Sequence, residues 1–130
     1  MGPFTPSGAS VLLVESSAII GLDLAEELER LGYGVVGPFA CGIALQWVGT
    51  ATPDLALLDV DLRSGPCLAL ARELRARRVP ILVFSSHDRR SSLTEFHDLP
   101  WLSMPAPMDR LDAALRALAT EREPALLPCG

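Results

Sequence analysis

Residues 53–62 read PDLALLDVDL and contain the clearest structural signal in the chain. The apolar residues 55–58 follow Pro53 and Asp54 and end at Asp59. A short, continuous apolar run with polar residues on either side is typical of a strand that is buried on both faces. The run therefore predicts a central strand of a covered sheet, and it places the Asp59 carboxylate where that strand leaves the core.

The same pattern recurs on both sides of this strand. Short apolar runs predict further strands, and apolar residues spaced three or four apart predict helices between them. The predicted strands are 11–14, 33–37, 55–58, 81–84 and 101–103. The first predicted helix is capped by Ser16 or Ser17 and ends before Gly32, and the others are 41–50, 65–77, 88–97 and 108–118. Such alternation through short connections favours right-handed crossovers and a parallel sheet with helices on both faces. The sequence thus predicts a doubly wound α/β fold.

Length and composition fit a single globular domain. The chain has 130 residues, of which 49% are hydrophobic and 21% charged. We expect a flexible lead over residues 1–9, one domain over 10–119 and a tail over 120–130. No apolar run approaches the roughly 20 residues that a membrane span needs. The N-terminus lacks the basic region and apolar core of a secretory signal, so we expect a cytoplasmic protein.

The cysteines and the charged residues narrow the possible functions. Cys41, Cys67 and Cys129 are widely spaced and odd in number, which favours free thiols in a reducing compartment over a disulfide framework or a metal site. All 11 basic residues are arginine, so a Walker-type phosphate loop and lysine-based catalysis are excluded. The net charge is −5, and the densest basic stretch, 72–78, is interpreted as a solvated helix face. We therefore expect no nucleic-acid binding.

Two stretches match the residue pattern of known functional motifs but lack the structural context that those motifs require. The stretch GYGVVG at 32–37 follows a predicted helix and opens a strand, which is the reverse of a dinucleotide-binding loop. We interpret it as a helix stop followed by close backbone packing. Ser86, His87 and Asp88 are adjacent in sequence and cannot converge as a hydrolase triad does. His87 and His97 have no partners at the spacing of a zinc site.

Polar residues stand at the ends of several predicted strands. Glu15 follows the first strand, Asp59 follows the third and Ser85 follows the fourth. Parallel α/β sheets place their chemistry at the carboxyl ends of their strands. Two carboxylates in one site repel each other and favour a divalent cation with oxygen ligands, typically Mg²⁺. A hydroxyl at Ser85 could donate a hydrogen bond to an anion bound between them.

Four stretches resemble one known family. VLLVESS at 11–17, PDLALLDVDL at 53–62, VPILVFSS at 79–86 and WLSMPAP at 101–107 occur in the order and spacing of a bacterial response-regulator receiver domain. The resemblance covers roughly residues 10–118. It implies a (βα)5, flavodoxin-like fold with strand order 2-1-3-4-5, a phosphoryl group received from a histidine kinase or phosphotransfer protein, and a requirement for Mg²⁺.

The resemblance also implies roles for individual residues. Asp59 corresponds to the phosphoacceptor, and Ser85 to the hydroxyl residue that senses the phosphoryl group. Trp101 occupies the place of the aromatic residue that rotates during switching. The implied metal ligands are Glu15, Asp59 and Asp61, the last through its backbone carbonyl.

Two positions depart from the family pattern. The family ends its first strand with two acids, of which the second is a direct metal ligand, but here Ser16 follows Glu15. The family also has a lysine before the proline of the fifth-strand loop, where this chain has Met104. We expect weaker or lost Mg²⁺ binding and slow phosphorylation. Asp61, or an arginine such as Arg63 or Arg89, could compensate in part.

These departures favour a receiver-like module of a phosphorelay that acts through protein contact and is phosphorylated weakly or not at all. The alternative is a working receiver that accepts a phosphoryl group on Asp59. An unrelated small α/β enzyme is disfavoured because no complete catalytic set is found. The expected partners are a histidine kinase or phosphotransfer protein, a downstream protein target, or both. A homodimer through residues 88–119 is a further hypothesis from the resemblance.

Overall fold

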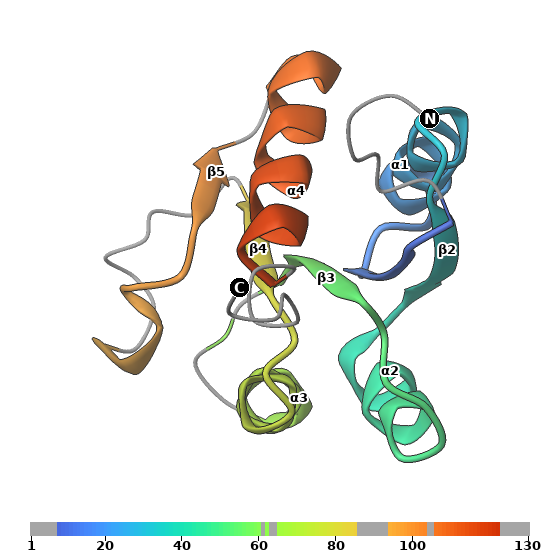
Figure 1. The fold of residues 1–130 in the computed structure, drawn as a ribbon. Helices are drawn as coiled ribbons and strands as arrows, with labels where there is room; N and C mark the ends of the chain where they lie inside the picture. The colour runs from blue at the N-terminus through green and yellow to red at the C-terminus, as the bar shows by residue number, and fades with distance from the viewer. Residues whose placement is uncertain (1–7, 61, 63–64, 86–93, 104–105, 123–130) are drawn as a thin grey trace.

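A computed structural model describes residues 8–60, 62, 65–85, 94–103 and 106–122 (Figure 1). Five parallel strands form one sheet in the order β2-β1-β3-β4-β5. The strands are β1 (Ser10–Glu15), β2 (Gly34–Phe39), β3 (Leu55–Asp59), β4 (Ile81–Ser85) and β5 (Trp101–Ser103). The α-helices are α1 (Ala18–Arg30), α2 (Cys41–Val48), α3 (Gly65–Ala76) and α4 (Met108–Arg122). This is the predicted fold class and strand order.

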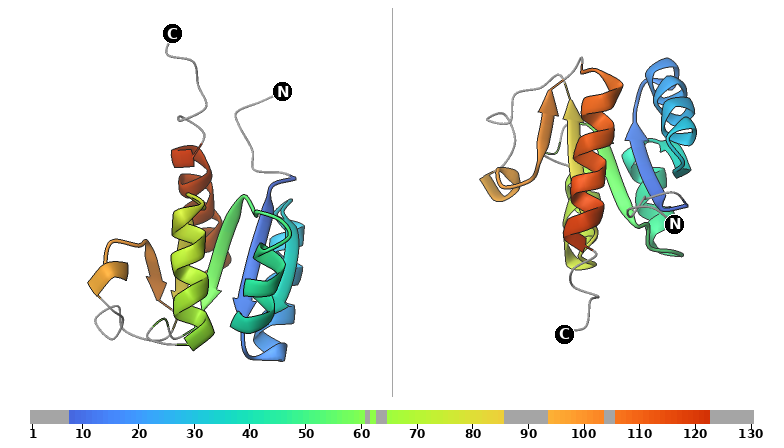
Figure 2. Two further views of the ribbon diagram at one scale, coloured as in Figure 1. Left: turned by 90° about the horizontal axis from the view of Figure 1, so that it is seen from below. Right: turned by 45° about the horizontal axis from the view of Figure 1, so that its top comes forward.

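The sheet is covered on both faces, with α1 and α4 on one side and α2 and α3 on the other (Figures 1 and 2). Side chains of each strand alternate between two buried clusters, as the pleat of a strand requires. The cluster beneath α2 and α3 contains Leu12, Leu58, Val83, Ala44 and Leu70. The cluster beneath α1 and α4 contains Leu13, Leu57, Leu82, Leu24 and Leu115. Burial on both faces explains why these strands read as continuous apolar runs.

Most element boundaries lie within one or two residues of the sequence-based prediction, and three elements differ in ways that need a reason. Strand β2 continues through Pro38 to Phe39, because an edge strand tolerates a residue without an amide hydrogen. Helix α4 continues to Arg122, three residues into the predicted tail. Most of the helix expected at 88–97 lies outside the described residues, and its described end is a 3-10 turn, η2 (Thr94–Phe96). None of the described helices is both long and apolar enough to cross a membrane.

The glycines of the GYGVVG stretch have the predicted structural roles. Gly32 has a φ of +103° just after α1 and is suited to ending that helix. Gly37 has a φ of +118°, and a Cβ built there would lie 2.4 Å from the Leu13 carbonyl oxygen. Leu12 pairs with Val36 and Val14 with Phe39, so β2 bulges beside Leu13. The interpretation as a helix stop and close backbone packing is confirmed.

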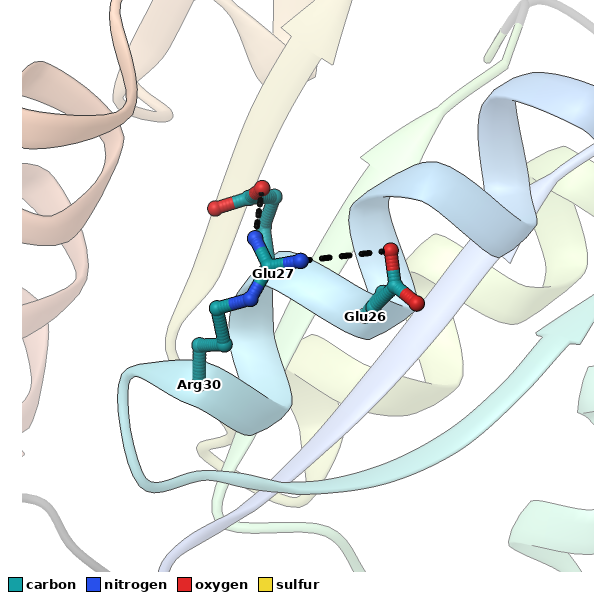
Figure 3. Close-up of polar contacts among 3 residues, drawn as sticks. All are labelled: Glu26, Glu27 and Arg30. Atoms are coloured by element: carbon teal, nitrogen blue, oxygen red, sulfur yellow. Dashed lines mark hydrogen bonds and ion pairs between the residues drawn. The ribbon is translucent and has the colours of Figure 1, made fainter.

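Helix α1 begins and ends with recognisable side-chain contacts. The Ser17 hydroxyl accepts a hydrogen bond from the amide of Ile20 at 3.4 Å and caps the N-terminus. In the last turn Arg30 pairs with Glu26 at 3.5 Å and also with Glu27 (Figure 3). The positive charge of Arg30 interacts favourably with the negative, C-terminal end of the helix dipole. Exposed ion pairs of this kind stabilise a helix by only about 0.3–0.5 kcal/mol each.

The arginines of α3 are exposed, as predicted, and they also join α3 to the segment before β5. Arg72 pairs with Glu95 at 2.6 Å, and Arg75 binds both carboxylate oxygens of Asp98 at 3.1 Å. These hydrogen bonds hold the pKa values of Glu95 and Asp98 below their usual range. The pairs fix the position of η2 against α3, an arrangement that periodicity alone did not indicate.

The expectation of free thiols is wrong for two of the three cysteines. Cys41 and Cys67 form a disulfide, with their Cα atoms 5.0 Å apart. They are 26 residues apart in sequence, and the packing of α2 against α3 brings them together. In the chain-entropy model, closing a loop of this length stabilises a fold by about 3–4 kcal/mol. Cys129 lies outside the described residues.

One buried polar group lies directly before the first residue of β2, away from the carboxyl ends of the strands. Tyr33 is only 3% exposed, and its hydroxyl has no hydrogen-bond partner among the described residues. Burial, reinforced by the nearby charge of Asp112 and opposed by Arg116, raises the pKa of Tyr33 to about 12. A neutral phenol is therefore strongly favoured over a phenolate in the folded chain.

This pKa makes the free energy of unfolding sensitive to high pH. The unfolded chain loses the Tyr33 proton near pH 10 and the folded chain near pH 12. The contribution of this group to the free energy of unfolding is therefore fully present below pH 10 and is lost as the pH rises from 10 to 12. The expected loss is up to about 3 kcal/mol. Urea unfolding below pH 10 and at about pH 11 measures it, and Tyr33→Phe should remove most of the difference. An equal loss in Tyr33→Phe would contradict this origin.

Candidate functional site

The structure brings the predicted polar residues to one edge of the sheet, where the carboxyl ends of all five strands lie. We call it the carboxyl edge. Glu15, the last residue of β1, is the direct register partner of Asp59, the last residue of β3. Ser85 ends β4 and is the register partner of Ser103 at the end of β5. The placement of Glu15, Asp59 and Ser85 at strand ends agrees with the prediction from the apolar runs.

Glu15 and Asp59 also share a face of the sheet. Each lies two residues beyond a leucine, Leu13 or Leu57, that packs beneath α1 and α4. Because side chains alternate along a strand, both carboxylates point to that same face. Two negative groups on adjacent strands repel each other, so this arrangement favours a cation between them.

Glu15 is the only charged side chain among the described residues that is buried, at 6% exposure. The Ser17 amide donates a hydrogen bond of 2.9 Å to Glu15 Oε2. The other oxygen, Oε1, is buried and has no hydrogen-bond partner among the described residues. A buried carboxylate oxygen without a partner is costly, and a hard divalent cation is the kind of ligand that would satisfy it.

Glycine on α1 makes this burial possible. A Cβ at Gly21 would lie 2.7 Å from Pro38 Cβ and 3.4 Å from Glu15 Cγ. Gly21 therefore lets α1 approach the end of β2 and cover the Glu15 side chain. Apolar spacing alone did not point to the contact of Gly21 with Pro38, although a glycine inside an apolar helix is a signal of close packing.

The remaining predicted site residues do not lie beside Glu15 and Asp59 on the same face of the sheet, or lie outside the described residues, except Ser16, which follows Glu15. Ser16 is exposed beside the buried Glu15. Trp101 pairs in register with Val83 and packs partly buried on the cluster beneath α2 and α3, on the other face from the two carboxylates. Asp61 and Met104 lie outside the described residues, as do the alternative charge donors Arg63 and Arg89.

Glu15 and Asp59 are the two described carboxylates that could contribute to a cation site. Within the described part of the chain, no group of three or more acidic, histidine or cysteine residues is placed to bind a metal. Glu15 and Asp59 supply two carboxylates, and Asp61 is the third ligand expected from the resemblance. Oxygen donors of this kind suit Mg²⁺, which commonly keeps several waters and few protein ligands.

Sequence comparison links the chain to bacterial regulators. No family model matches it. The transcriptional regulatory protein PdtaR of Mycobacterium tuberculosis is 32% identical over 103 residues, covering 75% of this chain and 50% of the relative. The response regulator protein GraR of Staphylococcus epidermidis is 33% identical over 79 residues, covering 60% and 35%. The chain thus spans about half the length of the first relative and about a third of the second.

Solved structures match over most of the chain. The N-terminal domain of a response regulator from Carboxydothermus hydrogenoformans has a TM-score of 0.78 at 20% identity and covers 91% of this chain and 99% of that one. A CheY-like receiver domain from Methylobacillus flagellatus has a TM-score of 0.72 at 24% identity, covering 86% and 99%. Response regulator TrrA of Thermotoga maritima has been solved with Mg²⁺ and BeF, with a TM-score of 0.71 at 23% identity and coverage of 85% and 98%. It has also been solved with the histidine kinase ThkA, with a TM-score of 0.71 at 22% identity and coverage of 85% and 97%.

These comparisons confirm the fold and the resemblance together. The chain has the fold of a response-regulator receiver domain, with the predicted strand order and with polar residues at the carboxyl edge. The two curated relatives are a transcriptional regulatory protein and a response regulator, and the chain is similar to them over 75% and 60% of its length.

Proposed function

We propose that this chain is a receiver-like module of two-component signalling that acts by protein contact, with Asp59 phosphorylated slowly or not at all. One observation carries this proposal. At the end of β1 the buried acid Glu15 is followed by exposed Ser16, where the family has a second acid. The absence of lysine from the whole chain supports it, because no ammonium group is available to bind phosphoryl oxygens.

The residues at the carboxyl edge fit a divalent cation in part. Glu15, whose Oε1 has no hydrogen-bond partner among the described residues, and Asp59 would hold it, with Asp61 as the third ligand that the resemblance implies. When bound, Mg²⁺ would neutralise charge on the phosphoryl oxygens. Ser16 is uncharged and offers only a hydroxyl, so the cation is expected to be held more weakly than by two acids.

In a phosphoryl transfer to this chain, Asp59 and Ser85 would have separate roles. An Asp59 carboxylate oxygen would form a bond to phosphorus while the bond from phosphorus to the donor nitrogen breaks, and the donor histidine would leave. Ser85, at the end of the neighbouring strand, is the group expected to donate a hydrogen bond to the transferred phosphoryl group. Removing one preorganised donor from developing charge costs about 10²–10³ in rate, which is the expected effect of having no lysine.

The second candidate is a working receiver, and a specific observation favours it. The buried Oε1 of Glu15 is directly beside the phosphoacceptor strand and has no partner among the described residues. Burial of such a group is easier to explain if a cation is bound there at least part of the time. In that case Asp59 would accept a phosphoryl group at a useful rate.

Exposed apolar side chains near this edge support a protein partner. In the described residues the large exposed hydrophobic side chains are Ile19, Ile20, Leu22 and Ile43. Three of them lie in the first turns of α1, which starts directly after the Glu15 strand. Apolar surface of this kind favours a protein contact. A histidine kinase or phosphotransfer protein, and a downstream target, are the proposed partners. Dimerisation through residues 88–119 and a cytoplasmic location stay predictions.

The distinguishing experiment is intact-mass spectrometry after incubation with Mg²⁺ and acetyl phosphate or phosphoramidate. We expect little or no phosphoryl adduct on the wild-type chain and none on Asp59→Asn. In parallel, Asp59→Asn should leave binding to a partner or cellular output unchanged. A rapid, complete adduct on the wild type that is absent from Asp59→Asn would overturn the proposal and favour the working receiver.

A further inference from the structure

The Cys41–Cys67 disulfide lies at a position where it can affect the site. Cys41 is the first residue of α2 and Cys67 is the third residue of α3. Both helices begin at the carboxyl edge of the sheet, and they pack side by side on one face (Figures 1 and 2). The disulfide therefore joins the first turns of two helices at the edge that carries Asp59.

The two described residues between Asp59 and α3 pack on the same cluster as the disulfide. Val60, the residue after Asp59, packs on the buried cluster beneath α2 and α3, and Leu62 is 2% exposed within it. Cys41 belongs to that cluster and Cys67 packs against it. The phosphoacceptor strand end, the start of α3 and the start of α2 thus share one packing unit. A change in the disulfide alters the restraint on that unit.

The two cysteines differ in accessibility in a way that suits thiol exchange. Cys41 is buried at 6% exposure, whereas Cys67 is only partly buried. Attack by an external thiolate would therefore occur at Cys67 Sγ and release the Cys41 thiolate. Both sulfur atoms lie in first turns of helices, where the partial positive charge of the helix end favours a thiolate. Thiolate is the form that reacts in exchange.

The hydrophobic core is large enough for the chain to fold without this disulfide. Two apolar clusters cover both faces of a five-stranded sheet in a chain of 130 residues. Chains of this length bury enough surface to fold without cross-links, unlike the small domains that need several. A single disulfide at the functional edge is therefore better explained by a local role than by a general need for stability.

We propose that Cys41 and Cys67 form a reversible thiol–disulfide site that controls the mobility of Val60, next to Asp59, and of the first turn of α3. The oxidant is a disulfide compound, written RSSR. The Cys67 thiolate attacks RSSR and expels one RS⁻, and the Cys41 thiolate then attacks Cys67 Sγ and expels the second. The two cysteine protons end on the two RSH molecules formed, so atoms and electrons balance. Reduction by two thiols follows the reverse path.

The test uses the full chain carrying Cys129→Ser, equilibrated in reduced and oxidised glutathione at graded ratios. Alkylation followed by mass spectrometry gives the fraction with a Cys41–Cys67 disulfide. We expect that fraction to rise and fall reversibly with the ratio. A disulfide that stays closed at every ratio, or one that never forms, would overturn the proposal.

Amide hydrogen exchange tests the second part of the proposal, the effect of the disulfide on mobility. Amides at Val60 and in the first turn of α3 are expected to exchange roughly tenfold faster in the reduced chain. Cys67→Ala should show the fast rate in both buffers, with Cys41→Ala as a second variant in case one of them folds poorly. The reference chain for both is Cys129→Ser alone. Equal exchange in the reduced and oxidised chains would overturn this part.

Any effect of the disulfide on phosphorylation of Asp59 rests on the proposed function, whereas thiol titration and amide exchange do not. A chain that fails to accept a phosphoryl group can still show redox-dependent exchange at Val60. A chain that is rapidly phosphorylated can show none. The two proposals therefore fail independently.

Discussion

The double substitution Ser16→Asp and Met104→Lys is expected to raise the rate of Asp59 phosphorylation by acetyl phosphate about 10²–10³-fold. Ser16 is exposed next to the buried Glu15, so an aspartate there would add a charged oxygen ligand at the carboxyl edge without disturbing the core. A lysine at position 104 would supply the cation that the chain lacks entirely. Both changes stabilise negative charge that develops on the phosphoryl group.

Intact-mass spectrometry at several times after mixing with Mg²⁺ and acetyl phosphate measures this rate. Adding Asp59→Asn to the double variant should abolish the adduct. Arg110→Lys is a suitable control, because Arg110 is exposed on α4 and the substitution adds a lysine elsewhere without changing net charge. If the correctly folded double variant is phosphorylated no faster than the wild type, the two departures do not limit the site, and compensation by Asp61 or an arginine becomes the better explanation.

The substitution Gly37→Ala is expected to reduce the free energy of unfolding by at least about 3 kcal/mol. Gly37 has a φ of +118°, a conformation that residues with a Cβ rarely adopt. The added Cβ would lie 2.4 Å from the Leu13 carbonyl oxygen and 3.0 Å from the Phe39 amide nitrogen. Both neighbours are backbone atoms, so no side-chain rotation can relieve the clash, and β1 or β2 would have to move.

Urea unfolding of Gly37→Ala beside Gly42→Ala measures this effect. Gly42 lies in α2, and a Cβ there would have no atom within 4 Å. Replacing an exposed helical glycine by alanine is expected to raise stability by roughly 0.5–1 kcal/mol. The two alanine substitutions should therefore change stability in opposite directions. A Gly37→Ala chain as stable as the wild type would show that the bulge beside Leu13 can move at little cost.

The local sequence determined the fold class and part of the site. Four-residue apolar runs such as 55–58 identify strands buried on both faces, since only such strands lack polar positions. Parallel strands align their carboxyl ends, so Glu15 and Asp59 had to reach the same edge once those strands were recognised. Helix spacing and the glycine after α1 fixed the boundaries of that helix closely. The polar segment at 88–97 gave a weak pattern, and its described end is a 3-10 turn.

Other features were decided only by the tertiary structure. The disulfide joins cysteines 26 residues apart, and nothing in their spacing shows that α2 and α3 begin side by side. The same is true of Gly21 against Pro38, and of Arg75 binding Asp98. Periodicity reports which side of its own helix or strand a residue occupies. It carries no information on the distance between two elements, because that distance is set by how their side chains pack together.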